Sequence, residues 1–478
     1  MDSDKKETLY DEIANRVMTL ISQGVLKPGE KIPSIREMSN KLGVSINTVK
    51  ESYYQLENSR FIEAVPQSGY YVTSALPAKA EPAVSTERIE NLNPSRVSLC
   101  SIYGAFKEQN ICAPGAELGI AAIDPKLWPS EKIYKYYQET LKTSGHEIMD
   151  YCIAPGYRPL REQIALFSIK NGISGSADDY IITDGCSESL YLALSAVLEK
   201  GDTIAVESPI YFNLLHLCDM LGLNVIEIPS DPEKGIHIET LEFALEQYEI
   251  KAVLVITAFS NPTGSLLSPE RMRQLVELTA RHGIPLIEDM IYSELFYDGK
   301  PPKSCKAFDT EGNVILCSSF SKFLAPGIRV GWISAGKYKD IIIRNKTILN
   351  IGTTALPQMV IAKFMQEGGV ERYLRNLRKT LKTQVETMRS TILDTFPDGT
   401  GVLMPQGGFL LWVELPEHLD ANKLYTQLIS ERIIVAPGSM FSMTGKYNNF
   451  MRLNAGIWNS SIEHSIEIIG EYAKAYKD

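Results

Sequence analysis

One stretch decides the fold of this 478-residue chain: Ser318-Ser319-Phe320-Ser321-Lys322-Phe323-Leu324-Ala325-Pro326-Gly327-Ile328-Arg329. A lone lysine is usually a solvated surface charge, but Lys322 stands among hydroxyl side chains and Arg329 follows seven residues later. A lysine amine bonds reversibly to aldehydes, while hydroxyls and guanidinium groups bind phosphate. The stretch therefore predicts a site for pyridoxal 5′-phosphate (PLP), with Lys322 bonded to the cofactor. The phosphate group of PLP would be bound by Ser319, Ser321 and Arg329.

Short apolar runs upstream predict the strands of a mostly parallel sheet. They alternate with stretches of helical periodicity, and they comprise Ala252–Thr257, Ile284–Ile287 and Val314–Cys317. Strands of this kind are buried on both faces, and ligands bind at their carboxyl ends. Polar residues follow each run, namely Asn261, Asp289 and Lys322. The sequence thus predicts an α/β domain with its site at that edge of the sheet.

The order of these motifs resembles the fold-type I PLP enzymes of the class I aminotransferase group, from about Ala113 to the C-terminus. The resemblance implies that Asn261 and Tyr292 share the cofactor's phenolic oxygen. It also implies that Asp289 faces the pyridine nitrogen, where an ionised acid keeps the ring protonated and electron-accepting. Each residue alone also fits a turn, a helix cap or a core position. With Lys322, Asp289 and Tyr292 form the predicted catalytic set.

Further matches complete the pocket that the resemblance implies. Gly185-Cys186-Ser187 lies between a strand-like and a helical segment, where backbone N–H groups bind phosphate. Tyr211 matches the aromatic side chain that stacks on the cofactor ring, although it also fits plain packing. Tyr151 resembles the tyrosine that reaches the phosphate of a neighbouring subunit, which implies a homodimer. Arg452 resembles the arginine that binds a substrate α-carboxylate, with a surface ion pair as the alternative.

The first 75 residues predict a separate domain built from three helices and a hairpin. Apolar spacing indicates a first helix from Leu9 to Gln23. Ser34 is expected to cap a second helix, and Ser45 a third that turns its apolar side chains inward: Ile46, Val49, Tyr53 and Leu56. The alternating segments 60–65 and 69–73 predict a hairpin. Two capped helices joined at Gly43-Val44 indicate a helix-turn-helix with a wing.

The opposite face of the third helix suits the major groove of DNA, because Asn47, Lys50 and Tyr54 share it. The segment from Lys27 to Val49 resembles the GntR-type winged helix. The predicted DNA-binding residues are Ser34, Arg36, Ser45, Asn47, Thr48, Lys50 and Tyr54. A protein-interaction module remains the alternative.

Two departures from the GntR pattern concern charge. Ile46 stands where that family commonly has arginine, and the wing tip Pro66-Gln67-Ser68-Gly69 has no basic residue. Up to Leu76, nine Lys and Arg face ten Asp and Glu. Nonspecific attraction to DNA should therefore be modest, and tight binding would need two domains presented by a dimer to paired sites.

Composition predicts a soluble, cytoplasmic protein. A net charge of −10 with 22% charged and 44% hydrophobic residues is ordinary for such chains. Seven cysteines without metal-ligand spacing favour a reducing compartment and no metal site. No apolar run has the length of a membrane span, and no signal-peptide segment is expected at the N-terminus.

The predicted organisation is a winged helix over residues 1–75, a linker over 76–112 and the aminotransferase-like domain over 113–478. In this order the chain resembles the MocR family of bacterial transcription regulators. The resemblance implies a PLP-dependent regulator that responds to an amine or amino acid and moves its DNA-binding domains. Two alternatives stay open: an active aminotransferase with a DNA-binding-like appendage, and a regulator that senses PLP itself.

Overall fold

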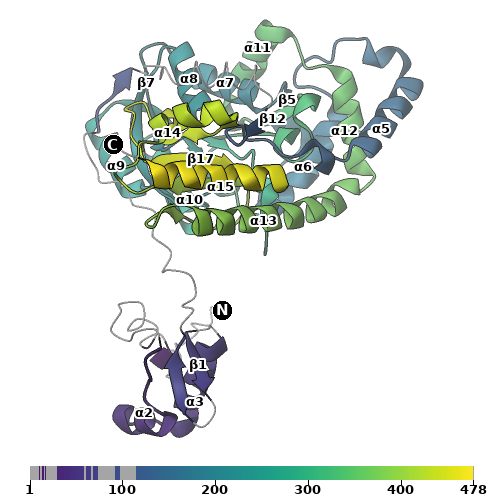
Figure 1. Cartoon of the computed structure of the whole chain (residues 1–478). Coiled ribbons are helices and arrows are strands. Elements are labelled where there is room, and N and C mark those ends of the chain that lie inside the picture. The colour runs from purple at the N-terminus through teal and green to yellow at the C-terminus, as the bar shows by residue number, and fades with distance from the viewer. Residues whose placement is uncertain are drawn as a thin grey trace. The chain divides into compact units, whose positions relative to one another are not determined.

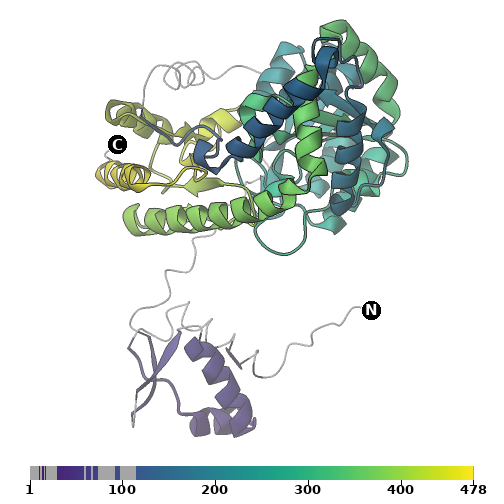
Figure 2. The same ribbon diagram turned by 90° about the vertical axis from the view of Figure 1, so that its right-hand side faces the viewer.

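The computed structural model describes residues 29–58, 61–65, 68–73, 92–96 and 115–476, together with residues 10, 13, 14 and 17. The chain divides into two compact units, Met1–Pro82 and Ala83–Asp478, which are drawn in Figures 1 and 2. The division falls inside the segment predicted to be a linker.

The small unit has the elements of a winged helix-turn-helix. Its described elements are α2 (Ile35–Leu42), α3 (Ile46–Asn58), β1 (Ile62–Val65) and β2 (Gly69–Val72). Ser34 caps α2 in a capping box with Glu37, and Gly43 ends that helix in the left-handed conformation. The strands β1 and β2 pair antiparallel as the predicted wing.

The core of the small unit is formed around α3. Val49, Tyr53 and Leu56 are fully buried as predicted, and the Tyr53 hydroxyl donates a 2.7 Å hydrogen bond to the Pro33 carbonyl. The prediction for Ile46 is wrong, because 52% of this side chain is exposed. Ile46 is the first residue of α3, where the helix extends beyond the small core. Of the predicted first helix, residues 13, 14 and 17 are buried, and most of the rest lies outside the described residues.

The large unit is built on a mostly parallel sheet with the strand order β3-β7-β6-β9-β10-β11-β12-β5, and β8 pairs with β7. The strands β7, β6, β9, β10 and β11 are parallel, whereas β12 runs antiparallel to both of its neighbours. Their bounds are β3 Ser95–Arg96, β5 Tyr180–Thr183, β6 Thr203–Ser208, β7 Asn224–Asp231, β8 Gly235–Ile236, β9 Ile250–Ile256, β10 Leu286–Asp289, β11 Val314–Ser319 and β12 Gly331–Ser334. The predicted α/β fold is confirmed.

Helices cover both faces of this sheet, as Figures 1 and 2 show. Leu254 and Ile287 face the core beneath α7, α8 and α11, while Val253 and Leu286 face the core beneath α9 and α10. Neighbouring residues on one strand thus bury opposite faces, which explains why these strands read as continuous apolar runs. The helices are α7 Cys186–Val197, α8 Phe212–Met220, α9 Ile238–Gln247, α10 Pro269–Arg281 and α11 Lys339–Asn350.

A second, antiparallel sheet forms the C-terminal part with the strand order β13-β14-β17-β16. Its strands are β13 Gly401–Val402, β14 Leu410–Glu414, β16 Ala436–Pro437 and β17 Phe450–Asn454. The other helices are α5 Ser130–Thr143, α6 Arg158–Ser168, α12 Ala355–Gln366, α13 Gly369–Thr395, α14 Ala421–Leu428 and α15 Ser460–Ala475, and β4 (Ala116–Glu117) pairs with β15 (Ile433–Ile434). None of the helices in the described ranges is both long enough and apolar enough to span a membrane.

Residues 92–96 lie within the predicted linker, yet they pack on the large unit. The strand β3 pairs antiparallel with β7, and the Tyr248 hydroxyl donates a hydrogen bond to the Leu92 carbonyl. Residues 74–91 and 97–114 lie outside the described residues.

Candidate cofactor site and nucleic-acid interface

The predicted site residues of the large unit follow the carboxyl ends of adjacent parallel strands. Asn261 follows β9, Asp289 ends β10, and Lys322 follows β11 in a short 3-10 helix. Because β9, β10 and β11 are neighbours in the sheet, these three side chains are brought to one edge. Arg452 enters from β17 of the second sheet and bonds to Asn261.

Lys322 lies in the partly buried centre of this site. Its Nζ donates a 2.6 Å hydrogen bond to the Ala121 carbonyl and lies 5.9 Å from the ring centroid of Tyr292. Burial, followed by the nearby charge of Arg452, lowers the pKa of Lys322 to about 8. A larger share of this amine is therefore uncharged near neutral pH than for an ordinary lysine, which makes it a better nucleophile.

Asp289 is 4% exposed and is held in place by two donors. Its Oδ1 accepts hydrogen bonds from the Ile291 N–H at 2.9 Å and from the Cys186 thiol at 3.5 Å. Burial raises the pKa of Asp289 to about 6, although these bonds and Lys322 act in the opposite direction. A cationic ring nitrogen placed beside this carboxyl would hold it ionised.

A buried chain of hydrogen bonds joins Arg452, Asn261 and Tyr292. Arg452 Nη1 donates to Asn261 Oδ1 at 2.9 Å, and Asn261 Nδ2 donates to the Tyr292 hydroxyl at 3.4 Å. Arg452 is 1% exposed, its Nη2 donates to the Gly119 carbonyl, and its Nε has no hydrogen-bond partner among the described residues. No carboxylate pairs with this guanidinium in the described ion pairs. The buried cation therefore has a spare N–H that can bind an anion.

The turn before α7 and the arginine after Lys322 face each other. Gly185 has φ of +93°, and a Cβ at this position would collide with the Arg329 guanidinium. Arg329 Nη2 donates to the Asp184 carbonyl at 2.7 Å, and Nη1 donates to Ser321 Oγ at 3.4 Å. Glycine is therefore required here by the close approach of a cation to a helix N-terminus, an arrangement that fits a phosphate group.

The remaining predicted site residues have the following contacts and burial. The Ser319 and Ser321 hydroxyls lie 2.8 Å apart, and Ser319 also donates to the Val330 carbonyl. The Tyr211 hydroxyl accepts a 3.0 Å bond from Asn213, and its ring lies 4.8 Å from that of Phe212. Cys186 is buried and Ser187 is exposed in the first turn of α7.

Tyr151 is not gathered into the site, because 75% of its side chain is exposed on the surface of the unit. This placement is compatible with its assignment to a second subunit, which stays a prediction.

Sequence reasoning missed the contribution of the segment 119–122. The carbonyls of Gly119 and Ala121 accept hydrogen bonds from Arg452 and Lys322. These acceptors are main-chain atoms, so no side-chain motif could have revealed them. Glu207 was also missed, although it is buried and accepts bonds from the Ile256 N–H and the Ser260 hydroxyl beside Asn261.

The predicted DNA-binding residues lie on the outer surface of the small unit. Asn47, Lys50 and Tyr54 of α3 are exposed, Tyr54 to 61%. Ser45 accepts from the Thr48 N–H at 3.1 Å and so caps α3. Ser34 and Arg36 are exposed at the start of α2. A helix whose polar face is free of packing can enter the major groove.

Comparisons with known proteins agree with both units. Residues 9–72 match the bacterial regulatory proteins of the gntR family, and residues 123–469 match the aminotransferases of class I and II. The chain therefore belongs to a class of proteins that joins a GntR helix-turn-helix to an aminotransferase fold, and that fold family is PLP-dependent. This combination is that of the MocR-type regulators, and the chain is a member of that family.

Two relatives from Escherichia coli K12 match nearly end to end. The uncharacterized HTH-type transcriptional regulator YjiR is 37% identical over 97% of this chain and 98% of its own length. The regulator YdcR is 32% identical over the same shares. Among solved structures, the kynurenine aminotransferase of Pyrococcus horikoshii is 29% identical and superposes with a TM-score of 0.73, covering 79% of this chain and 95% of its own.

Proposed function

We propose that this protein regulates transcription as a homodimer, binds paired DNA sites through its winged helices, and senses an amine or amino acid with the help of PLP at Lys322. The observation that carries the proposal is the pairing of two features in one chain. The small unit has an exposed polar face on α3, and the large unit has a buried arginine that pairs with no carboxylate among the described residues and lies near a lysine of lowered pKa.

The residues of the large unit fit PLP and divide its binding among them. Lys322 would bond the cofactor, Asp289 would lie against the ring nitrogen, and Tyr292 with Asn261 would bind the phenolic oxygen. When bound, PLP supplies an aldehyde that captures amines reversibly and a ring that accepts electrons. The turn at Gly185 and the Arg329 guanidinium would hold its phosphate, supported by Ser187, Ser319, Ser321 and the partner's Tyr151.

Arg452 would select ligands that carry a carboxylate. Its guanidinium is buried against Phe212 and Phe441, whose ring centroids lie 5.9 and 5.2 Å away. A carboxylate that reaches Arg452 would gain a charged hydrogen bond from the spare Nε–H at a buried position. An amino acid is therefore the class of effector that the site favours over a simple amine.

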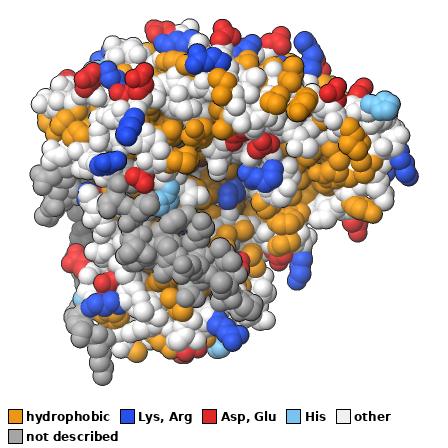
Figure 3. Space-filling view, turned by 90° about the horizontal axis from the view of Figure 1, so that it is seen from above, with side chains coloured by type: hydrophobic (Ala, Val, Ile, Leu, Met, Phe, Trp, Pro, Cys, Tyr) orange, Lys and Arg blue, Asp and Glu red, His pale blue; other side chains and the backbone are white. Residues whose placement is uncertain are grey.

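An exposed apolar surface supports the dimer. Figure 3 shows hydrophobic side chains gathered on the upper face of the large unit, where Figure 1 places α11. Exposed apolar residues occur at the end of α11 and in the segment around Tyr151, and they include Met149, Ile153, Ile348, Leu349 and Ile351. The two segments are joined, because the Ala154 N–H donates to the Ile351 carbonyl. Apolar surface of this kind is typical of an interface between subunits.

Sedimentation and footprinting test this proposal together. The full chain is expected to sediment as a dimer and to protect two half-sites in the DNA upstream of its own coding region. A monomer, or a single protected half-site, contradicts the dimer. Absence of any protected site in genomic DNA contradicts regulation by DNA binding.

Aminotransferase activity is the second candidate, favoured by the likeness to solved aminotransferases and by the presence of Lys322, Asp289 and Arg452 in one site. Turnover of an amino acid with a 2-oxo acid at about 1–10³ per second would support it. We expect turnover far below that range.

A further inference from the structure

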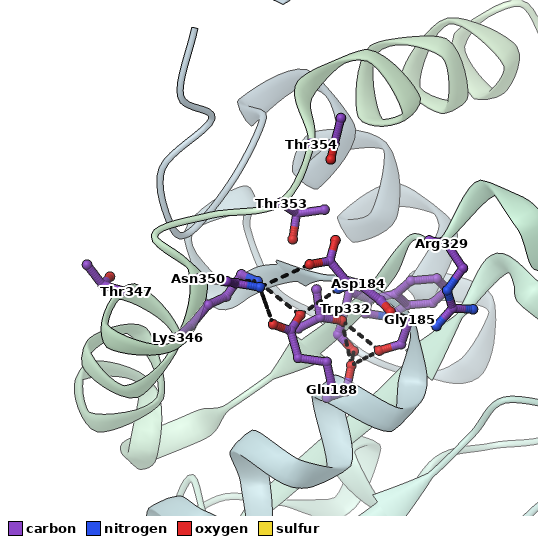
Figure 4. Close-up of polar contacts among 12 residues, drawn as sticks. Asp184, Gly185, Glu188, Arg329, Trp332, Lys346, Thr347, Asn350, Thr353 and Thr354 are labelled. Carbon is purple, nitrogen blue, oxygen red and sulfur yellow. Dashed lines mark hydrogen bonds and ion pairs between the residues drawn. The ribbon is translucent and has the colours of Figure 1, made fainter. Parts of the chain in front are cut away.

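A polar cluster around the buried Lys346 lies next to the phosphate turn and belongs to neither predicted site. It consists of Asp184 before the turn, Glu188 in the first turn of α7, and Lys346 and Asn350 of α11, as Figure 4 shows. Lys346 is 0% exposed and the Glu188 side chain is 10% exposed. Burial of ionised groups is costly unless they are paired, so a cluster of this composition requires an explanation.

The contacts run in one chain from α11 to the phosphate turn. Lys346 Nζ lies 3.0 Å from Glu188 Oε2, and Asn350 Nδ2 donates to Glu188 Oε1 at 2.6 Å. The Glu188 carboxylate accepts the Asp184 N–H at 2.5 Å, and the Asp184 carbonyl accepts the Arg329 guanidinium at 2.7 Å. Glu188 is therefore bonded to the residue whose carbonyl accepts Arg329.

The charges of the cluster bear on an anion at this turn. Glu188 is an acid in the first turn of α7, close to where a phosphate dianion is expected to bind. Two negative charges near each other repel, so the carboxylate would weaken phosphate binding. Asp184 adds a second carboxyl, whose pKa is raised by burial and by Glu188 and lowered by Lys346. Lys346 forms an ion pair with Glu188, whereas the hydrogen bond of Arg329 to Asp184 goes to the main-chain carbonyl.

We infer that Lys346 and Glu188 are positioning residues for the phosphate group of the cofactor: Glu188 fixes the turn that orients Arg329, and Lys346 neutralises Glu188 so that the turn accepts a dianion. This inference rests on the proposed PLP site. It extends the phosphate site from the residues expected to touch the phosphate to a buried pair on α7 and α11.

The test compares PLP with pyridoxal, which lacks the phosphate, by fluorescence titration of the full chain. The ratio of the two dissociation constants measures the preference for phosphate. Lys346→Met leaves Glu188 uncompensated and is expected to lower this preference at least about tenfold. Adding Glu188→Gln restores neutrality and keeps an acceptor for the Asp184 N–H, so the double variant should recover to within about threefold of the wild type. Arg344→Met, an exposed change on the same helix, should leave the ratio unchanged.

Several outcomes overturn the inference. One is an equal loss of affinity for PLP and pyridoxal in Lys346→Met, which would indicate a merely structural role. Another is an unchanged ratio in that variant, or a double variant that recovers nothing. If Lys346→Met does not fold, Glu188→Gln alone decides, because it should keep or raise the preference for phosphate and a fall contradicts the inference. A wild type that binds no PLP overturns the proposed function itself.

Discussion

Substitution of Arg452 by methionine tests whether the buried guanidinium selects carboxylates. The side chain is 1% exposed, donates to Asn261 and to the Gly119 carbonyl, and has an Nε–H without a partner among the described residues. Methionine retains an unbranched apolar side chain in the same space and removes the charge. The variant should still accept PLP, because Lys322, Asp289 and Arg329 are unchanged.

The size of the effect follows from burial. A buried charged hydrogen-bond pair contributes about 2–5 kcal/mol to binding, which corresponds to a loss of about 30- to 5000-fold in affinity. An amine without a carboxylate never makes this contact, so its affinity should change by less than about threefold. The expected signature is thus a selective loss for amino acids.

Spectral titration of the PLP-loaded protein measures both affinities. Each amino acid is compared with the amine that decarboxylation would give, in the wild type, in Arg452→Met and in the control Arg375→Met, which changes an exposed arginine of α13. If amino acid and amine weaken equally in Arg452→Met, the substitution has disturbed the site through Asn261. If neither weakens, the carboxylate is bound elsewhere. Either result refutes the assignment.

Three further predictions concern other parts of the molecule. Replacement of both Asn47 and Lys50 by alanine should abolish DNA binding in a mobility-shift assay while the visible absorption of PLP-loaded protein stays unchanged, since the two sites lie in separate units. Lys322→Ala should lose that absorption. Borohydride reduction of the wild type should attach PLP permanently to Lys322, which mass spectrometry will locate; attachment to another lysine would refute the assignment. Burial raises the pKa of Glu207 to about 8 from 4.5, so its contribution to stability is fully present below about pH 4.5 and is lost as the pH rises to about 8. Glu207→Gln does not titrate and should therefore raise the melting temperature more at pH 8 than at pH 5; an equal rise at both would contradict the buried acid.

The sequence predicted the fold well because its signals were local. Continuous apolar runs at β9, β10 and β11 reflect burial on both faces of the sheet, and the capping serines Ser34 and Ser45 marked the helix starts where the structure has them. The failure at Ile46 has a physical cause, since apolar periodicity cannot tell where a small core ends.

The sequence predicted which side chains form the site, but not which of them contact one another. Asn261 and Arg452 are 191 residues apart, and their direct hydrogen bond depends on how the second sheet packs against the first. The pairing of Lys346 with Glu188 spans 158 residues and likewise depends on the packing of α11 against α7. Such contacts carry no local signal.

The central claim is that chemistry at Lys322 changes DNA binding, and one measurement tests it most directly. The affinity of the full chain for the DNA upstream of its own coding region should be measured by fluorescence anisotropy, with and without PLP and with each amino acid added. Coupling between sites typically amounts to about 1–3 kcal/mol, so the wild-type affinity should change by about 5- to 150-fold, and the affinity of Lys322→Ala should not change. Equal DNA affinity of the wild type under all these conditions would contradict the account.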